Sequence, residues 1–289
     1  MFEGLGIKRE NFPHSKVKAE GMISIIPEVK RFEIGYIQDV IYKTVENKSL
    51  KLQILRPWNA KELLPVLIYI PGSAFHTQNV YERIPQGTLF SELGYVVALL
   101  EYRGSEDAVY PALIEDAQDG IRFMVQHAKE FGGSSEKIYI AGDSSGAHTA
   151  MASVLMWNEK NGNNPVKGVI DFYGPTNLSV MNNEPSSQNH TTRDSPEGLI
   201  LGGITINENK DMWEKANLLN YVTSKSLPPF LMFHGTNDEL VPFGQSCMLY
   251  EKLKKFNHQA ALYAIENAHH GGSEFLCEQV IDIVRNFIG

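Results

Sequence analysis

Short runs of apolar residues recur along the chain from Pro65 onward, and polar or amphipathic stretches separate them. The runs cover residues 66–70, 95–100, 138–141, 168–172, 230–233 and 260–265. Each is largely apolar, which predicts strands covered on both faces, as in a parallel sheet between two layers of helices. We therefore predict an α/β protein.

An earlier pair of stretches has a different pattern. In residues 49–55, apolar and polar side chains alternate, and the polar residues 46–48 suit a turn. Together with residues 38–44, this pattern predicts an antiparallel hairpin with one face in solvent.

Apolar residues at helical spacing predict four further elements. These helices cover residues 119–131, 146–161, 243–256 and 275–288, with Ser273 as the candidate N-cap of the last one. Gly132 and Gly133 follow the first helix and are typical of a helix end.

The segment 137–150 carries the strongest chemical pattern. Its residues Gly142-Asp143-Ser144-Ser145-Gly146 match Gly-x-Ser-x-Gly, with an apolar strand before and an alanine-rich helix after. A serine on a tight strand-to-helix turn adopts strained backbone angles, and larger residues two positions away on either side would collide with the adjoining elements. We predict that Ser144 is a nucleophile; an ordinary glycine-rich turn is the alternative.

A nucleophilic serine needs a base and an acid that orients the base. The acid is expected just after a late strand, where Asp238 stands, with its neighbour Glu239 as a rival. The base is expected after the final strand, where His269 and His270 are adjacent. We favour His270, because the glycines that follow it let the loop bring its ring over Ser144.

The reaction also needs N–H donors for a developing oxyanion. One is expected from the amide of Ser145, directly after the nucleophile. The others are expected from the loop after strand 66–70, where Gly72, Ser73 and Ala74 are small enough for a close approach of the backbone to substrate.

Two segments lack a sustained pattern. Residues 174–227 are rich in Asn, Ser, Pro and Thr, with a candidate helix at 211–219. A connection of that length is usually functional or disordered, so we predict an insertion over the active face with no core of its own. Residues 1–34 are predicted to be an N-terminal extension with a short helix, and the chain (1–289) to be a single domain; either segment could form a lid.

The net charge is −8, from 26 basic and 34 acidic residues. No run of Lys and Arg follows a phosphate backbone, so neither nucleic acid nor an anionic membrane is an expected partner. Residues 1–20 lack the apolar core of a signal peptide. Two cysteines, Cys247 and Cys277, are too few for a disulfide framework or a metal cluster. We expect a cytoplasmic protein without a metal or cofactor.

Taken together, these segments resemble the α/β-hydrolase superfamily. The chain is most similar to the branch with hormone-sensitive-lipase-like carboxylesterases and bacterial acetylxylan and feruloyl esterases. The resemblance extends over roughly residues 39–289, and its motifs are the oxyanion loop 71–75, the stretch 102–117, the serine turn 142–146, His234-Gly235-Thr236-Asn237-Asp238 with Val241-Pro242, and His270-Gly271. It implies an eight-stranded, mostly parallel sheet with helices on both faces. Pro71, Ser73 and Ala74 depart from the usual His and two glycines, and we still expect a working oxyanion hole.

The leading hypothesis is a serine carboxylic-ester hydrolase that acts through an acyl-enzyme on small-molecule esters with short or medium acyl chains, with acylated sugars and hydroxycinnamoyl esters as candidate substrates. A serine aminopeptidase is one alternative, for which Glu101, Glu106 and Asp107 could bind the peptide N-terminus. A non-catalytic binding protein of the same fold is another. The sequence leaves monomer and homodimer equally open.

Overall fold

The computed structural model describes residues 11–28, 32–161 and 163–289. By its internal contacts the chain divides into two units, Met1–Arg31 and Phe32–Gly289. Residues 11–28 form no α-helix and no strand. The short helix predicted for the extension is therefore not found there, and residues 1–10 and 29–31 of that prediction lie outside the described residues.

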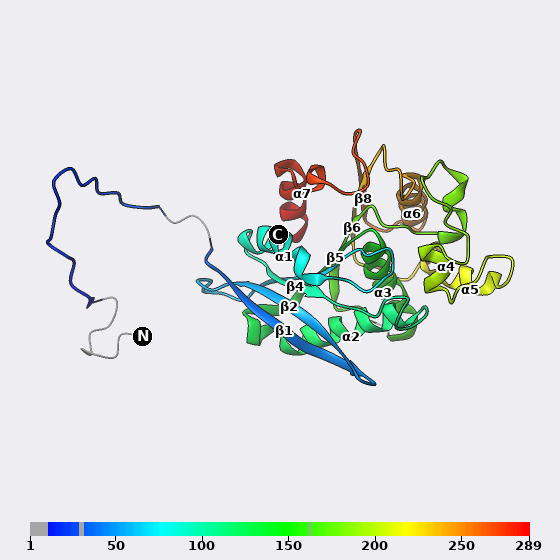
Figure 1. The fold of residues 1–289 in the computed structure, drawn as a ribbon, viewed down its shortest axis with the longest axis horizontal. Helices are drawn as coiled ribbons and strands as arrows, with labels where there is room; N and C mark the ends of the chain where they lie inside the picture. Colours follow the sequence, from blue (N-terminus) through cyan, green and yellow to red (C-terminus); the bar gives the residue numbers. More distant parts are fainter. Residues whose placement is uncertain (1–10, 29–31, 162) are drawn as a thin grey trace. The chain divides into compact units, whose positions relative to one another are not determined.

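Eight strands of the second unit form one sheet, in the order β1-β2-β4-β3-β5-β6-β7-β8 (Figure 1). The strands are β1 (Ile34–Val45), β2 (Lys48–Pro57), β3 (Leu64–Ile70), β4 (Val96–Leu100), β5 (Gly133–Asp143), β6 (Val166–Phe172), β7 (Phe230–Gly235) and β8 (Ala260–Ile265). Strand β2 is antiparallel to β1 and to β4, and all other neighbours are parallel. The predicted eight-stranded, mostly parallel sheet is confirmed.

Strand β8 lies at the edge of the sheet and pairs with β7 alone. The prediction that both of its faces are covered is wrong, because Tyr263 is 40% exposed and no residue of β8 is fully buried. An edge strand has neighbours on one side only, and an apolar run does not reveal that position.

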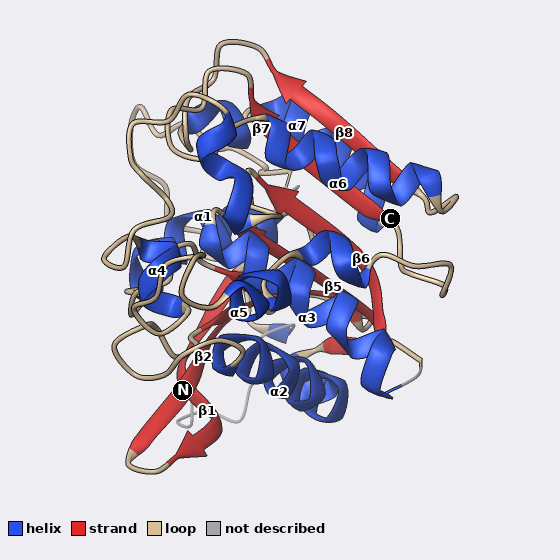
Figure 2. Cartoon of the chain, turned by 90° about the vertical axis from the view of Figure 1, so that its right-hand side faces the viewer, coloured by secondary structure: helices blue, strands red, loops and turns tan. Residues whose placement is uncertain are grey.

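Helices cover both faces of the sheet (Figure 2). They are α1 (Ile84–Glu92), α2 (Ala112–His127), α3 (Ser145–Asn161), α4 (Pro196–Ile200), α5 (Lys210–Lys215), α6 (Gly244–Lys255) and α7 (Glu278–Ile288). Helices α2, α3 and α6 share a buried cluster with Ile140 of β5. Helices α1 and α7 share another, on the opposite face, with Leu231 of β7. The parallel strands thus lie between two layers of helices, as the predicted architecture requires.

Helix α2 begins at Ala112, well before the predicted start at 119. The apolar spacing placed the start of α2 too late because Asp116 is fully buried, where it forms ion pairs with Arg103 at 2.8 Å and Lys43 at 2.7 Å. A charged residue on the buried face of a helix interrupts the apolar spacing from which the start is predicted. Helix α1 was missed altogether, since Gly87 on its buried side leaves only a weak apolar stripe.

The predicted C-terminal helix divides into a 3-10 helix (Ser273–Leu276) and α7. Ser273 is the first residue of the 3-10 helix and does not cap it; the cap position is Gly272, and α7 follows Cys277. The N-cap prediction is therefore wrong. The predicted helices at 146–161 and 243–256 correspond to α3 and α6.

The predicted insertion, residues 174–227, folds into short pieces. They are a 3-10 helix (Leu178–Asn183), α4, α5 and a second 3-10 helix (Leu218–Tyr221). The candidate helix at 211–219 is thus α5 and the start of that 3-10 helix, with a break between them. Trp213 is fully buried and belongs to the same core cluster as α3. This packing anchors the segment to the sheet layer.

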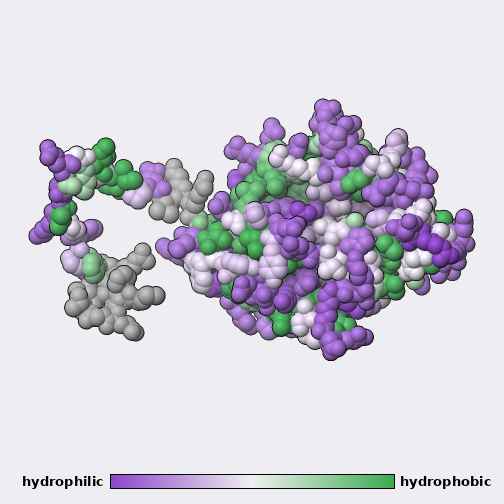
Figure 3. Space-filling view, in the orientation of Figure 1, coloured by the Kyte–Doolittle hydropathy of each residue, from purple (hydrophilic) through white to green (hydrophobic). Residues whose placement is uncertain are grey.

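The surface of residues 32–289 in the view of Figure 3 is mainly hydrophilic, with small separate hydrophobic patches. Within the described ranges, no helix combines the length and the apolarity needed to cross a membrane.

Candidate active site

Ser144 lies on the turn between β5 and α3, with φ at +52°. The two flanking glycines make this turn possible. A Cβ atom at Gly142 would lie 2.5 Å from the carbonyl oxygen of Gly146, and one at Gly146 would lie 2.1 Å from that of Ile70. Ser144 donates its amide to Phe172 O of β6 at 2.9 Å, which fixes the turn at the carboxyl edge of the sheet.

The structure brings Ser144, His270 and Asp238 into contact. Ser144 Oγ lies 2.9 Å from His270 Nε2, and His270 Nδ1 lies 2.8 Å from Asp238 Oδ2. The rival residues pair with one another, since His269 Nδ1 lies 3.0 Å from Glu239 Oε2 on the exposed side of the loops. The geometry therefore favours His270 and Asp238 over His269 and Glu239.

The loop after β8 carries His270 to Ser144 through positive backbone angles. Gly271 and Gly272 have φ of +80° and +108°, a region that favours glycine. The ring of Tyr173 packs edge-on against His270 at 4.8 Å between centroids. The ring of His270 is thereby held beside Ser144.

A second histidine, besides the two predicted as candidate bases, contacts Asp238. His234 is fully buried at the end of β7, and its Nε2 lies 3.2 Å from Asp238 Oδ2 and 2.8 Å from Val241 O. Both of these neighbours are acceptors, so Nε2 carries the proton and Nδ1 accepts from Ser246 Oγ at 2.7 Å. The sequence feature that points to this contact is the spacing, because His234 lies four residues before Asp238.

Asp238 is held as a carboxylate. Burial raises its pKa, but hydrogen bonds from His234 and His270 outweigh that effect and leave the pKa well below its ordinary value. The amides of Leu240 and Val241 donate to its other oxygen, Oδ1, at 2.9 and 2.8 Å. The carboxylate is thus fixed on both oxygens, with Oδ2 facing the two histidines.

Asp171, at the end of β6, shows the opposite behaviour. It is fully buried, and its Oδ1 accepts from Gly174 N at 2.8 Å, while Oδ2 has no partner within the described ranges. Burial raises its pKa to about 7, against smaller lowering effects of the Gly174 amide and His234. It takes no part in the contacts of Ser144.

Two of the four predicted oxyanion donors are engaged elsewhere. The amide of Gly72 donates to Asp143 Oδ1 at 3.2 Å, and that of Ser73 donates to Ser145 Oγ at 2.9 Å. The prediction that Gly72 and Ser73 donate to the oxyanion is therefore wrong, because their amides stabilise the loop instead. The amides of Ala74 and Ser145 have no acceptor among the described residues, and both residues line the cavity beside Ser144.

Asp143, next to the nucleophile, holds the loop 71–76 in place. Besides Gly72, its carboxylate accepts from Tyr69 Oη at 2.8 Å and from Arg83 at 3.0 Å. In the same loop, Ala74 and Phe75 have φ of +51° and +62°. Left-handed angles at two residues with side chains are strained, and this strain is sustained only where surrounding bonds fix the loop.

A small cavity of about 50 Å³ adjoins Ser144 and His270. The predicted oxyanion donors Ala74 and Ser145 are part of its lining, together with Phe75. The insertion supplies the rest together with the loop after β7: Pro175, Gln188, His190, Pro196, Glu197, Leu240 and Val241. The sequence did not reveal these residues, because a polar loop without periodicity does not show which side chains turn inward.

The acidic residues suggested for a peptide N-terminus lie outside this lining. Glu106 pairs with His76 at 2.6 Å, Asp107 pairs with Lys48 at 2.5 Å, and Glu101 accepts from Lys51 N at 3.2 Å. In the part of the chain that the structure describes, no group of three or more His, Cys, Asp and Glu side chains is arranged to hold a metal ion.

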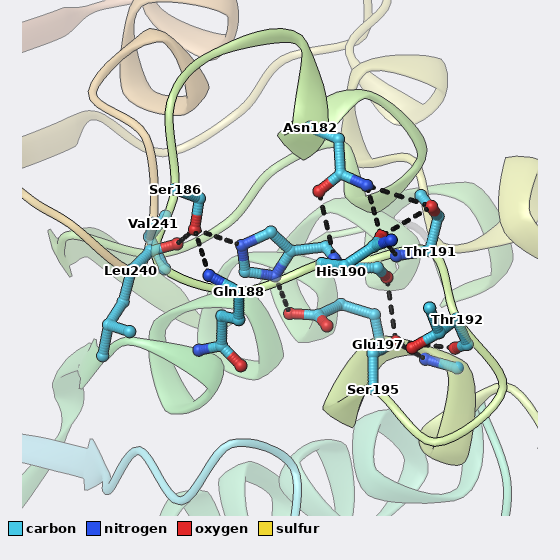
Figure 4. A network of polar contacts seen from close by, with 12 residues as sticks. Asn182, Ser186, Gln188, His190, Thr191, Thr192, Ser195, Glu197, Leu240 and Val241 are labelled. Atoms are coloured by element: carbon cyan, nitrogen blue, oxygen red, sulfur yellow. Dashed lines mark hydrogen bonds and ion pairs between the residues drawn. The ribbon is translucent and has the colours of Figure 1, made fainter.

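A polar network within the insertion borders the cavity (Figure 4). His190 lies at its centre, with Nδ1 3.0 Å from Glu197 Oε1 and Nε2 2.8 Å from Ser186 Oγ. Its backbone amide donates to Asn182 Oδ1 at 3.0 Å. The network links the insertion to the loop after β7, because Ser186 Oγ also donates to Leu240 O at 3.0 Å.

The segment that contains the loop 71–76, Ser144 and Asp238 matches one known family. The family model described as BD-FAE matches residues 52–253, well over half of the chain. This chain belongs to the BD-FAE family. His270 lies beyond the matched span, and its place in the site follows from its contacts with Ser144 and Asp238. The predicted resemblance to the carboxylesterase branch of the α/β hydrolases is confirmed.

Curated relatives of this BD-FAE chain carry esterase names. Esterase LipQ of Mycobacterium tuberculosis is 26% identical over 237 residues, which cover 78% of this chain and 55% of LipQ. The probable isoprenylcysteine alpha-carbonyl methylesterase ICMEL1 of Oryza sativa is 24% identical over 275 residues, 88% of this chain and 64% of that protein. The chain thus spans less than two thirds of the length of these relatives.

Solved structures show the same fold. A truncated carbohydrate esterase from gut microbiota superposes with a TM-score of 0.78 at 23% identity, over 91% of this chain and 97% of that one. Propionate-bound esterase 2 of Thermogutta terrifontis has a TM-score of 0.68 at 24% identity, over 91% and 95% of the two chains. The predicted α/β-hydrolase fold is confirmed.

Proposed function

We propose that the chain is a serine carboxylic-ester hydrolase. The observation that carries this proposal is the continuous hydrogen-bonded series Ser144 Oγ, His270 and Asp238, which ends beside a cavity. The esterase names of its relatives support the same reaction class.

In the proposed acylation step, Ser144 Oγ attacks the ester carbonyl carbon while His270 Nε2 takes the hydroxyl proton. The carbonyl oxygen becomes an oxyanion, which the free amides of Ala74 and Ser145 stabilise. The bond from the carbonyl carbon to the alcohol oxygen then breaks, and His270 returns its proton to the departing alcohol. Asp238 orients the ring and stabilises the imidazolium throughout.

Deacylation repeats these steps with water. His270 Nε2 removes a proton from the water as its oxygen attacks the acyl carbon, and a second oxyanion forms in the same position. The bond to Ser144 Oγ breaks, the serine regains its proton from His270, and the carboxylic acid leaves. Every proton in this cycle passes through His270, so no metal or cofactor is required.

We further propose short acyl esters as substrates, with acylated sugars and hydroxycinnamoyl esters as narrower candidates. A cavity of about 50 Å³ suits a small group better than a long chain. Propionate and butyrate complexes of one structural neighbour, and the description of another as a carbohydrate esterase, agree with this choice. Action as a monomer or homodimer in the cytoplasm, without nucleic acid or membrane partners, remains part of the proposal.

The test is the hydrolysis of p-nitrophenyl acetate, butyrate and octanoate. We expect acetate and butyrate to exceed octanoate in kcat/KM, and Ser144→Ala to lower kcat/KM by about 10⁴-fold or more, because the nucleophile is lost. The matched control is Ser153→Ala on the same helix, whose hydroxyl is buried away from the site and bonds to Ala150 O. Retained turnover in Ser144→Ala, or none in the wild type, would refute the proposal.

A further inference from the structure

The cavity beside Ser144 contains one buried carboxylate that the proposed reaction does not use. Among the described residues that line this cavity, Glu197 is the only acidic one, and it is 5% exposed. It lies in the short helix α4, whose N-cap Ser195 accepts from Gly198 N at 3.0 Å. The backbone around Glu197 is therefore fixed.

The two oxygens of Glu197 differ in their partners. Oε1 lies 3.0 Å from His190 Nδ1, whereas Oε2 is buried without a hydrogen bond to any described residue. A buried carboxylate oxygen without a donor is costly, and native structures usually supply one from the protein, water or a ligand. Oε2 is therefore an unused acceptor on a side chain that lines the cavity.

His190 keeps Glu197 from turning away. It is 1% exposed, and both ring nitrogens and the backbone amide have partners in the network of Figure 4. A rotation of the Glu197 carboxylate would break its contact with His190 Nδ1. The acceptor is thus preorganised, as a specificity contact requires.

A second polar group stands at the mouth of the same cavity. Gln188 lines it, and the side-chain amide of Gln188, which is exposed, has no hydrogen bond within the described ranges. A group that donates to Glu197 Oε2 could accept from Gln188.

We propose that Glu197 is a specificity-determining residue that accepts a hydrogen bond from a hydroxyl group of the ester substrate. This inference rests on the proposed function and adds a substrate class to it: short esters that carry a free hydroxyl close to the ester bond. A hydroxyl both donates and accepts, which matches one free carboxylate oxygen and one free amide. An ammonium group would bring three donors to a wall that offers one buried acceptor.

The test compares esters of nearly equal shape. On the acyl side, ethyl glycolate is compared with ethyl propionate; on the alcohol side, 2-hydroxyethyl acetate is compared with propyl acetate. The measured quantity is the ratio of kcat/KM for the hydroxyl ester to that for the alkyl ester. Because both esters are measured on one preparation, this ratio does not depend on the fraction of folded enzyme.

The key variant is Glu197→Gln, which keeps the shape of the side chain and removes its charge; Glu197→Met removes both polar atoms. We expect Glu197→Gln to lower the ratio by about tenfold in one of the two pairs, and Glu197→Met to lower it at least as far, because a hydrogen bond to a charged acceptor is lost. The affected pair identifies the side of the ester that enters the cavity. Asp194→Asn is the charge-matched control, since Asp194 is exposed on the same segment, and its ratio should equal that of the wild type.

Equal ratios for the wild type and both variants in both pairs would overturn the inference. So would a preference of the wild type for the ammonium ester ethyl 3-aminopropionate over ethyl 3-hydroxypropionate that Glu197→Gln abolishes, because the substrate class would then be cationic. Failure of the proposed function looks different: the wild type would hydrolyse none of these esters, or Ser144→Ala would retain activity.

Discussion

Asp238 accepts hydrogen bonds from two histidines that have different surroundings. His270 faces Ser144, whereas His234 is fully buried and fixed by Ser246 and Val241. His234 cannot reach a substrate, so its contribution acts through Asp238. It is a positioning residue that keeps the carboxylate ionised and oriented toward His270.

Replacing His234 tests this contribution. We expect His234→Leu to lower kcat/KM by about tenfold or more, because Asp238 loses a donor and the ring of His270 loses its fixed orientation. His234→Gln can place an amide N–H near the position of Nε2 and should recover most of the activity. A merely structural role would predict equal losses of activity for the two variants at equal stability.

The same substitution has a pH signature in stability. The folded-state pKa of Asp238 lies below its unfolded value of 3.8, so the ionised carboxylate stabilises the fold above about pH 4. That contribution is lost as the pH falls through the folded-state pKa. We expect the difference in unfolding free energy between wild type and His234→Leu, measured by urea unfolding, to be smaller at pH 3 than at pH 7. A difference that grows toward acid would contradict this assignment.

At the scale of elements, the turn from β5 to α3 depends on how closely α3 approaches the end of β3. Gly146 lies at this approach, since a Cβ atom there would be 2.1 Å from Ile70 O and 2.5 Å from the carbonyl carbon of Pro71. Both of these are backbone atoms. A side chain at this position can be accommodated only if the helix and the loop 71–76 separate, which would move the amides of Ala74 and Ser145 as well.

Gly146→Ala is therefore expected to destabilise the fold by about 3 kcal/mol or more and to abolish ester hydrolysis. Gly244→Ala at the start of α6 is the matched control. A Cβ there would meet the carboxylate end of Glu184, a flexible side chain that can move aside, so we expect a loss within about 1 kcal/mol. Thermal unfolding of both variants makes the comparison. Similar stability of the two would show that the contact at Gly146 does not govern the turn.

At the scale of the whole molecule, Phe32–Gly289 forms a compact unit by its internal contacts. This unit contains the eight strands, the cavity lining and the three residues of the proposed triad. Everything that the proposed reaction requires thus lies after residue 31.

A protein that begins at residue 32 should consequently fold and act like the full chain. We expect its melting temperature to stay within about 3 °C and its kcat/KM for p-nitrophenyl acetate within about twofold. Circular dichroism and steady-state kinetics provide the measurements. A large fall in activity with unchanged melting would instead indicate that residues 1–31 contribute to the site, as a lid formed by the extension would.

Elements with local signals can be predicted from the amino-acid sequence alone. A continuous apolar run predicts a covered strand, and the pattern Gly142 to Gly146 follows from the steric demands of one turn. Ser144, Asp238 and His270 could be singled out for a similar reason, since each stands in the connection that follows a strand, and the parallel strands bring those ends to one edge of the sheet.

Features that depend on contacts between distant residues are established only in the folded chain. The tertiary structure leaves β8 partly exposed at the edge of the sheet and assigns the amides of Gly72 and Ser73 to Asp143 and Ser145. It also brings Glu197, from a loop without periodicity, to the cavity beside Ser144. Residue type and spacing encode backbone conformation and burial, whereas the partner of a polar atom is fixed only when the whole chain is packed.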